Sequence, residues 1–225
     1  MQIPSQFPAE ILDRIEESAV IAVLVIDEAA HAVPAARALL AGGIGAMELT
    51  LRTPAALDAL AAIREEVPDM LAGIGTILTP GQVDEVLAAG AAFGVSPGLN
   101  PEVVTHARQA GFPFAPGVAT PGELEKAIAL GCREVKLFPA EAMGGLDYLK
   151  SFGAPYRHLG IRYIPLGGLN AGNMADYLRE PSVLALGGSW LAKQNVIQRN
   201  DWETIRQNAA EARIRADQIR TRPES

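Results

Sequence analysis

The sequence contains few of the side chains that bind metals or form disulfides. Its 225 residues include one cysteine, Cys132, and three histidines, His31, His106 and His158. A single cysteine permits neither an intrachain disulfide nor a cysteine-based metal cluster. No His-x-His or His-Glu-x-x-His motif is present, and the histidines fall in predicted helices or ahead of a predicted strand. We therefore expect no metal and no other cofactor.

Basic clusters and long apolar runs are also scarce. The formal net charge is −7, and no basic stretch is dense enough to follow a phosphate backbone, so we expect no nucleic-acid partner. The longest uninterrupted apolar run, residues 19–26, is too short to span a bilayer. The first residues lack the basic and apolar regions of a signal peptide. We therefore expect a cytoplasmic protein with no membrane partner.

The chain does contain short apolar runs that alternate with amphipathic runs. The runs predict strands over residues 20–26, 46–49, 71–74, 93–95, 112–115, 134–138, 162–165 and 183–186. They predict intervening helices over residues 29–41, 55–67, 80–89, 101–109, 121–130 and 170–178. Four predicted helices begin with an N-cap residue followed by proline: Thr53-Pro54, Thr79-Pro80, Asn100-Pro101 and Thr120-Pro121.

About eight consecutive strand-then-helix units predict an α/β fold, a (β/α)8 TIM barrel that forms a single domain over residues 1–225. We expect an extra N-terminal helix over residues 8–17 to close the bottom of the barrel, and a last helix over residues 202–219. The alternative is an open doubly wound sheet. No Gly-x-Gly-x-x-Gly follows the first strand, where a dinucleotide-binding fold would place it.

The active site of such a barrel lies at the carboxyl ends of its strands. Side chains alternate along a strand, so Glu48, Thr50 and Arg52 of the second strand share one face. Their apolar neighbours take the face toward the helices, which directs the polar set inward. A structural Glu–Arg pair at the top of the barrel is the alternative, although a carboxylate and a guanidinium there would be costly without a ligand or partner.

The sixth strand carries a lysine within an apolar run. Lys136 shares its face with Phe138, opposite Val135 and Leu137. Lysine is almost never fully buried unless paired. If it points inward, desolvation and a nearby cation such as Arg52 favour the neutral amine, which can attack a ketone. The alternatives are a lysine that reaches outward to solvent and one that forms a salt bridge with Glu48.

Paired glycines follow the seventh and eighth strands. Gly167-Gly168 and Gly187-Gly188 allow backbone N–H groups to approach an anion, and the ends of these two strands are the usual phosphate position in such barrels. Gly73-Ile74-Gly75-Thr76 ends the third strand and offers a hydroxyl, whereas Ser96-Pro97-Gly98 by itself indicates only a turn. The sequence thus predicts an anionic ligand, held with its phosphate at the two glycine pairs.

Together these segments resemble the 2-keto-3-deoxy-6-phosphogluconate (KDPG) aldolase family, which also includes 4-hydroxy-2-oxoglutarate (KHG) aldolases. The resemblance covers about residues 18–192 and rests on Glu48-Leu49-Thr50-Leu51-Arg52-Thr53, Gly73-Ile74-Gly75-Thr76, Ser96-Pro97-Gly98, Val135-Lys136-Leu137-Phe138-Pro139-Ala140-Glu141, Gly167-Gly168 and Gly187-Gly188-Ser189-Trp190. It implies a homotrimeric, metal-free class I (Schiff-base) aldolase. Such an enzyme cleaves KDPG to pyruvate and glyceraldehyde 3-phosphate in the Entner–Doudoroff pathway, and in some members also cleaves KHG.

The resemblance also implies a role for each matching residue. Lys136 forms the Schiff base and Glu48 shuttles protons. The substrate-binding residues are Arg52 and Thr76 at the pyruvate carboxylate, Pro97 and Phe138 along the pocket wall, and Gly167, Gly168, Gly188 and Ser189 at the phosphate.

One position departs from the family pattern. Leu166 stands where the family commonly has threonine, which leaves open the preference among phosphorylated and shorter keto acids. The Thr50-Leu51-Arg52-Thr53 stretch favours the gluconate branch over a galactonate-type relative, which usually carries Pro-Leu-Asn-Ser there. Two other functions remain: another phosphate-binding barrel isomerase or synthase, and a non-catalytic barrel that senses a phosphorylated ligand.

Overall fold

The computed structural model describes residues 3–220 and shows an α/β fold built from parallel strands in curled sheets. The strands are β1 (Val20–Leu24), β2 (Ala46–Thr50), β3 (Leu71–Gly75), β4 (Gly94–Val95), β5 (Phe114–Ala115), β6 (Gly117–Val118), β7 (Glu134–Leu137), β8 (Arg162–Pro165) and β9 (Leu186–Gly188). One sheet has the order β5-β4-β3-β2-β1-β9 and the other has the order β6-β7-β8.

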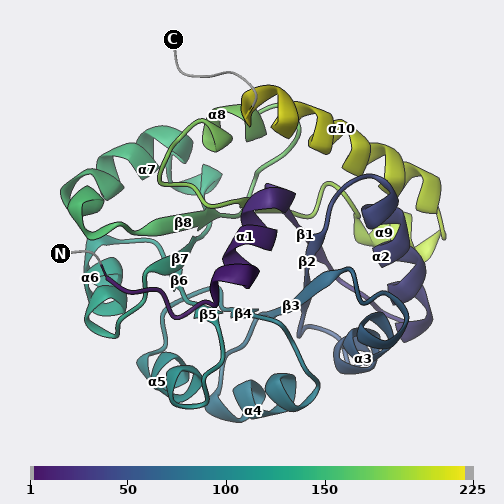
Figure 1. The fold of residues 1–225 in the computed structure, drawn as a ribbon, viewed down its shortest axis with the longest axis horizontal. Helices are drawn as coiled ribbons and strands as arrows, with labels where there is room; N and C mark the ends of the chain where they lie inside the picture. Colours follow the sequence, from purple (N-terminus) through teal and green to yellow (C-terminus); the bar gives the residue numbers. More distant parts are fainter. Residues whose placement is uncertain (1–2, 221–225) are drawn as a thin grey trace.

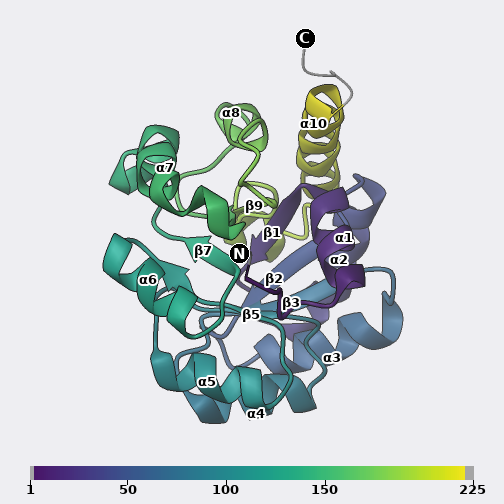
Figure 2. The ribbon, with the colours of Figure 1, turned by 60° about the vertical axis from the view of Figure 1, so that its left-hand side comes forward.

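Helices surround these strands (Figures 1 and 2). The α-helices are α1 (Ala9–Ser18), α2 (Ala32–Ala41), α3 (Ala56–Glu66), α4 (Pro80–Ala88), α5 (Pro101–Gln109), α6 (Pro121–Ala129), α7 (Gly145–Gly153), α8 (Met174–Leu178), α9 (Gln194–Gln198) and α10 (Trp202–Arg220). Three 3-10 helices are η1 (Ala29–His31), η2 (Glu141–Met143) and η3 (Ala154–Leu159). None of the helices in the described part of the chain is long and apolar enough to cross a membrane.

The two sheets approach each other at both of their edges. Parallel bridges pair Tyr163 with Val183 and Leu166 with Gly187, so β8 and the region of β9 lie side by side. At the other edge, β5 and β6 are separated only by Pro116. The predicted α/β class with parallel strands is therefore confirmed.

Apolar side chains form two layers, one on each face of the strands. The inner cluster includes Ile21, Phe93 and Ile164. Phe7 and Ile15 join the same cluster, because α1 crosses one end of the strands (Figure 1). The outer cluster packs the opposite strand faces against the helices. This separation follows from the two-residue alternation of side chains along a strand.

Most predicted elements are present, but their ends differ. The last strand is β9 at Leu186–Gly188, and the predicted strand over residues 183–186 is wrong in its bounds. Val183 forms only an isolated bridge, because pairing with β1 begins at Val20 and Leu186. A short apolar run predicts burial but does not separate a strand from buried coil.

Other bounds are corrected as well. The predicted strand over residues 20–26 ends at Leu24. The predicted strand over residues 112–115 begins at Phe114 and is followed by β6, because Pro116 lacks the N–H that continuous pairing requires. The predicted helix over 29–41 divides into η1 and α2. The predicted helix over 170–178 is shortened to α8, because the Asn170 side chain accepts a hydrogen bond from the Gly172 amide (2.8 Å) and so forms a turn there. Helices α7 and α9 were not predicted.

Three of the four predicted helix N-caps are present, and one is wrong. Thr79 and Thr120 form capping boxes, and the Asn100 side chain accepts a bond from the Glu102 amide. Thr53 is not an N-cap, because its hydroxyl donates to the Ile26 carbonyl and α3 begins only at Ala56.

Candidate active site

A cavity of about 340 Å³ lies at the carboxyl ends of the strands. All the predicted site residues line it: Glu48, Arg52, Thr76, Pro97, Lys136, Phe138, Gly167, Gly168, Gly188 and Ser189. Val23, Thr50, Leu166, Leu169 and Gly187 complete the lining. Its size falls within the usual range for a small-molecule site. The structure therefore brings together predicted site residues from six segments that are far apart in the sequence.

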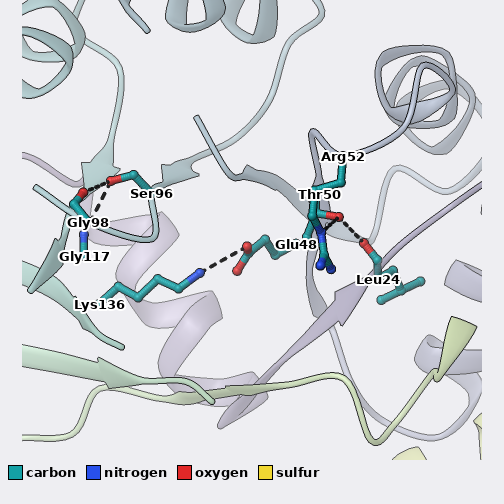
Figure 3. Close-up of polar contacts among 8 residues, drawn as sticks. All are labelled: Leu24, Glu48, Thr50, Arg52, Ser96, Gly98, Gly117 and Lys136. Atoms are coloured by element: carbon teal, nitrogen blue, oxygen red, sulfur yellow. Dashed lines mark hydrogen bonds and ion pairs between the residues drawn. The ribbon is translucent and has the colours of Figure 1, made fainter. Parts of the chain in front are cut away.

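Lys136 and Glu48 face each other across this cavity, from β7 and β2 respectively (Figure 3). The Lys136 Nζ lies 3.4 Å from Glu48 Oε1. Lys136 is 6% exposed and Glu48 is 2% exposed, which excludes the alternative of a lysine that reaches outward to solvent. The distance between Lys136 Nζ and Glu48 Oε1 is longer than the 2.7–2.9 Å typical of a charge-assisted hydrogen bond. The Phe138 ring borders the amine, with its centroid 5.5 Å from Nζ.

The Glu48 carboxylate has room because the neighbouring strand carries a glycine. A Cβ on Gly75 would lie 1.6 Å from Glu48 Oε1, far inside any real contact. In the register of β2 and β3, Gly75 pairs with Thr50 and Gly73 pairs with Glu48 itself. The motif Gly73-Ile74-Gly75-Thr76 did not by itself predict this steric role. The alternation Gly73-Ile74-Gly75 within a strand was the available signal.

Arg52 lies just beyond the end of β2, on the same side of the chain as Glu48. Its Nε donates to Thr50 Oγ1 (3.2 Å), and that hydroxyl donates to the Leu24 carbonyl (3.3 Å; Figure 3). Arg52 forms no salt bridge within residues 3–220. A positioned guanidinium without a carboxylate partner can bind the carboxylate of a ligand.

Thr76 adopts an uncommon backbone conformation at the end of β3. Its φ is +64°, in the left-handed region that β-branched residues rarely occupy. Such strain is found chiefly where the surrounding structure fixes a residue at a functional position. The conformation places Thr76 on the wall of the cavity.

The turn at Pro97 is held by Ser96. The Ser96 hydroxyl donates to the Gly98 carbonyl (2.7 Å) and accepts from the Gly117 amide (3.4 Å; Figure 3). A Cβ on Gly117 would lie 2.3 Å from the Pro97 carbonyl carbon and oxygen. The close approach of β6 to this turn fixes Pro97 at the cavity wall.

The first glycine pair is tied to the segment that follows β7. Gly167 and Gly168 have φ values of +95° and +84°, which favour glycine. The Glu141 amide donates to the Gly167 carbonyl (3.0 Å), and Glu141 Oε1 accepts from the Tyr177 hydroxyl (2.6 Å). Neither the role of Glu141 nor that of Tyr177 was predicted from the sequence, where Glu141 appears only as part of a motif. Because the partners lie on η2 and α8, no local pattern reveals this link.

No His, Cys, Asp or Glu residues within 3–220 form a group of three or more that could hold a metal ion. His106 lies away from the cavity and contacts Asp84 (2.7 Å). Cys132 is buried, and burial together with the charge of Glu134 raises its pKa to about 12. A thiol with so high a pKa stays protonated near neutrality and is a poor nucleophile.

The cavity is thus a lysine-centred site at the carboxyl ends of parallel strands, and the comparisons with known proteins agree with it. The family model described as "KDPG and KHG aldolase" matches residues 11–208. The 2-dehydro-3-deoxy-phosphogluconate aldolase of Treponema pallidum is 44% identical over 195 residues, which cover 87% of this chain and 92% of that protein. The KHG/KDPG aldolase of Escherichia coli is 42% identical over 193 residues, covering 86% and 90%.

Among solved structures, a KDPG aldolase from Legionella pneumophila superposes with a TM-score of 0.85 at 39% identity, covering 90% of this chain and 97% of that one. That structure holds pyruvate captured as a covalent carbinolamine. This chain belongs to the KDPG and KHG aldolase family.

Proposed function

We propose that the chain is a class I aldolase that cleaves KDPG to pyruvate and glyceraldehyde 3-phosphate through a Schiff base on Lys136. The observation that carries the proposal is the buried Lys136 amine, 3.4 Å from Glu48, in an open cavity. A lysine–glutamate pair with only a structural role would not need a cavity beside it. Family membership and the names of the relatives support the substrate.

The reaction begins at Lys136. Its neutral amine attacks C2 of the keto acid to give a carbinolamine, and loss of water gives an iminium ion. The iminium then accepts the electron pair of the C3–C4 bond as that bond breaks, so C3 becomes part of an enamine. Covalent catalysis of this kind divides one difficult step into easier ones.

Glu48 moves the protons. As the C3–C4 bond breaks, Glu48 takes the proton of the C4 hydroxyl, and glyceraldehyde 3-phosphate leaves as the aldehyde. Glu48 then returns a proton to C3 of the enamine, and hydrolysis of the resulting iminium releases pyruvate and free Lys136. One carboxylate serves as base and then as acid because the enamine intermediate lies beside the same group.

The remaining residues hold the two ends of the substrate. Arg52 and Thr76 bind the carboxylate of the pyruvate half, whereas the glycine pairs and Ser189 bind the phosphate through backbone amides and a hydroxyl. Pro97 and Phe138 shape the wall between these ends. KHG, which lacks the phosphate, is a slower second substrate, because it gains nothing from the glycine pairs.

Leu166 sets the middle of the pocket. It is 5% exposed, lines the cavity and belongs to the inner apolar cluster. A Cβ on Gly187 would lie 2.5 Å from Leu166 Cγ, so this leucine is held closely by the strand beside it. Its apolar side chain offers no hydrogen bond to the hydroxyl groups of the substrate. Substrate selection therefore depends on the groups that bind the carboxylate and the phosphate at the two ends of the ligand.

We also propose that the two sheets form one closed (β/α)8 TIM barrel, a single domain over residues 1–225 with the extra N-terminal helix, and that it assembles as a homotrimer in the cytoplasm without a metal or other cofactor. The edge bridges between β8 and β9 support closure, and the coverage of the relatives supports one domain. The partners are then a phosphorylated keto acid and two further copies of the chain.

Pyruvate release from KDPG tests the function against its alternatives. Lys136→Met should abolish release, whereas Lys126→Met, a matched change of an exposed lysine, should keep it. Pyruvate released equally by both variants would refute the role of Lys136. Binding of KDPG without any pyruvate release by the wild type would favour a phosphate-ligand sensor, and a different product would favour an isomerase or synthase.

A further inference from the structure

A second cavity, of about 400 Å³, lies at the opposite end of the strands from the candidate active site. We call it the basic cleft and define it by Arg133, Lys150, Arg157, Arg162, Tyr163 and Glu180. Arg133 precedes β7, and Arg162 is the first residue of β8, so both lie at the amino ends of their strands. Helix α7 and η3 supply the outer wall, and α7 lies beside β8 in Figure 1.

The charge of the basic cleft opposes that of the protein. Four cations and one carboxylate line it, although the formal net charge of the chain is −7. Arg162 pairs with Glu16 (3.1 Å), and Glu180 accepts from the Ser182 hydroxyl (2.9 Å). Lys150 and Arg157 form no salt bridge within the described residues. Two exposed cations without partners therefore border a recess that already carries positive charge.

Two buried polar atoms of the cleft residues also lack partners. Tyr163 is 2% exposed, and its hydroxyl makes no hydrogen bond within residues 3–220. The Nε of Arg162 is likewise buried without a partner there. A buried donor without an acceptor costs free energy that a bound acceptor would recover. Burial raises the pKa of Tyr163, so its hydroxyl is a proton donor at neutral pH.

We propose that the basic cleft binds a small phosphate-bearing organic anion, at a site separate from the aldolase cavity. The Tyr163 hydroxyl donates to a phosphate oxygen, and Lys150 and Arg157 balance the charge of the dianion. Leu149 and Ile161, both buried in the cleft wall, contact the carbon part of the ligand. A ligand at this end of the strands leaves the candidate active site open, so it does not compete with the aldolase substrate.

Tyrosine positions allow one experiment to report on both cavities. The chain has four tyrosines, and two of them, Tyr156 and Tyr163, line the basic cleft. Tyr177 instead contacts Glu141 near the first glycine pair. We therefore choose fluorine NMR of the fluorotyrosine-labelled full chain, titrated with phenyl phosphate and separately with inorganic phosphate, with Tyr163→Phe used to assign the Tyr163 signal.

The expected result is a saturable shift of the Tyr163 signal with phenyl phosphate, at lower concentration than with inorganic phosphate. Arg157→Met should weaken this binding by about tenfold, as expected for loss of one charged hydrogen-bonding partner. Lys126→Met, on α6 outside the cleft, should not. Equal affinity for both probes would indicate a site for free phosphate. It would refute the proposed contact between the apolar wall of the cleft and the carbon part of the ligand. No shift of Tyr163, or a shift that Arg157→Met leaves unchanged, would overturn the proposal.

Two more variants separate binding from structure. Tyr163→Phe removes an unpaired hydroxyl, so the thermal midpoint of the free protein should stay the same or rise while stabilisation by phenyl phosphate is lost. Gly153→Ala keeps every cation but places a Cβ 3.2 Å from the Tyr163 hydroxyl, and should also weaken binding. A lower midpoint for Tyr163→Phe would show that the hydroxyl has a partner in the free protein, which contradicts the proposal.

Discussion

Replacing Gly75 with alanine should displace the candidate proton-transfer group while leaving the candidate Schiff-base lysine in place. The added Cβ would lie 1.6 Å from Glu48 Oε1, so the oxygen must retreat by roughly 1.4 Å to reach the 3.0 Å below which such contacts essentially never occur. A misplacement of about 1 Å can cost about 10²-fold in rate. Loss of general acid–base catalysis costs about 10²–10⁴-fold. We therefore expect Gly75→Ala to lose about 10²–10³-fold in turnover.

The assay couples pyruvate release to lactate dehydrogenase, with borohydride trapping of pyruvate measured on the same samples. Gly81→Ala is the matched control, because a Cβ at Gly81 meets nothing within 4 Å. The prediction is reduced turnover with retained trapping for Gly75→Ala, and full activity for Gly81→Ala. Wild-type turnover in Gly75→Ala would refute the steric reasoning. Loss of trapping together with turnover would also contradict it, because the damage would then extend beyond Glu48.

Three further predictions concern binding, positioning and pH. Arg52→Met should raise the KM for KDPG about 10–100-fold with unchanged thermal stability, since it removes a charged partner of the substrate carboxylate; an unchanged KM in steady-state kinetics would exclude this role. Tyr177→Phe removes the hydrogen bond to Glu141, whose amide holds the Gly167 carbonyl. Because Tyr177 then positions the first glycine pair, the variant should raise KM more than it lowers kcat. Loss of thermal stability without a change in KM would instead indicate a structural role. Burial raises the pKa of Glu134, so its ionised form destabilises the fold above the unfolded-state pKa. Glu134→Gln should therefore increase the free energy of unfolding at pH 7. This gain should shrink as the pH falls from the raised folded-state pKa toward 4.5, and it should be absent below 4.5. Urea denaturation that shows no gain at pH 7 would contradict this.

Strand parity explains why much of the candidate site could be predicted from the sequence. Lys136 and Glu48 were each assigned an inward direction from the apolar character of their immediate neighbours, and both line the cavity. The same rule directs Glu134 inward, two residues before Lys136, and Glu134 is indeed 2% exposed. Its Oε2 accepts from the Ser5 hydroxyl (2.9 Å), a partner 129 residues away that no local pattern indicates.

Contacts between distant segments account for the other features that the sequence did not reveal. The requirement for glycine at Gly75 arises from a side chain on the neighbouring strand, and it appears only once the register of β2 and β3 is known. The start of β9 depends on where β1 begins to pair, rather than on the apolar run that precedes Leu186. The basic cleft combines residues from three stretches of the chain, so its charge is invisible in the overall acidic composition.

The most direct test of the proposed function is to locate the covalent adduct. The protein is incubated with pyruvate and borohydride, digested, and mapped by mass spectrometry across its four lysines, Lys126, Lys136, Lys150 and Lys193. The account predicts a reduced pyruvate adduct on Lys136, with full occupancy accompanying complete loss of aldolase activity. An adduct on another lysine, or an active enzyme in which Lys136 stays unlabelled, would contradict it.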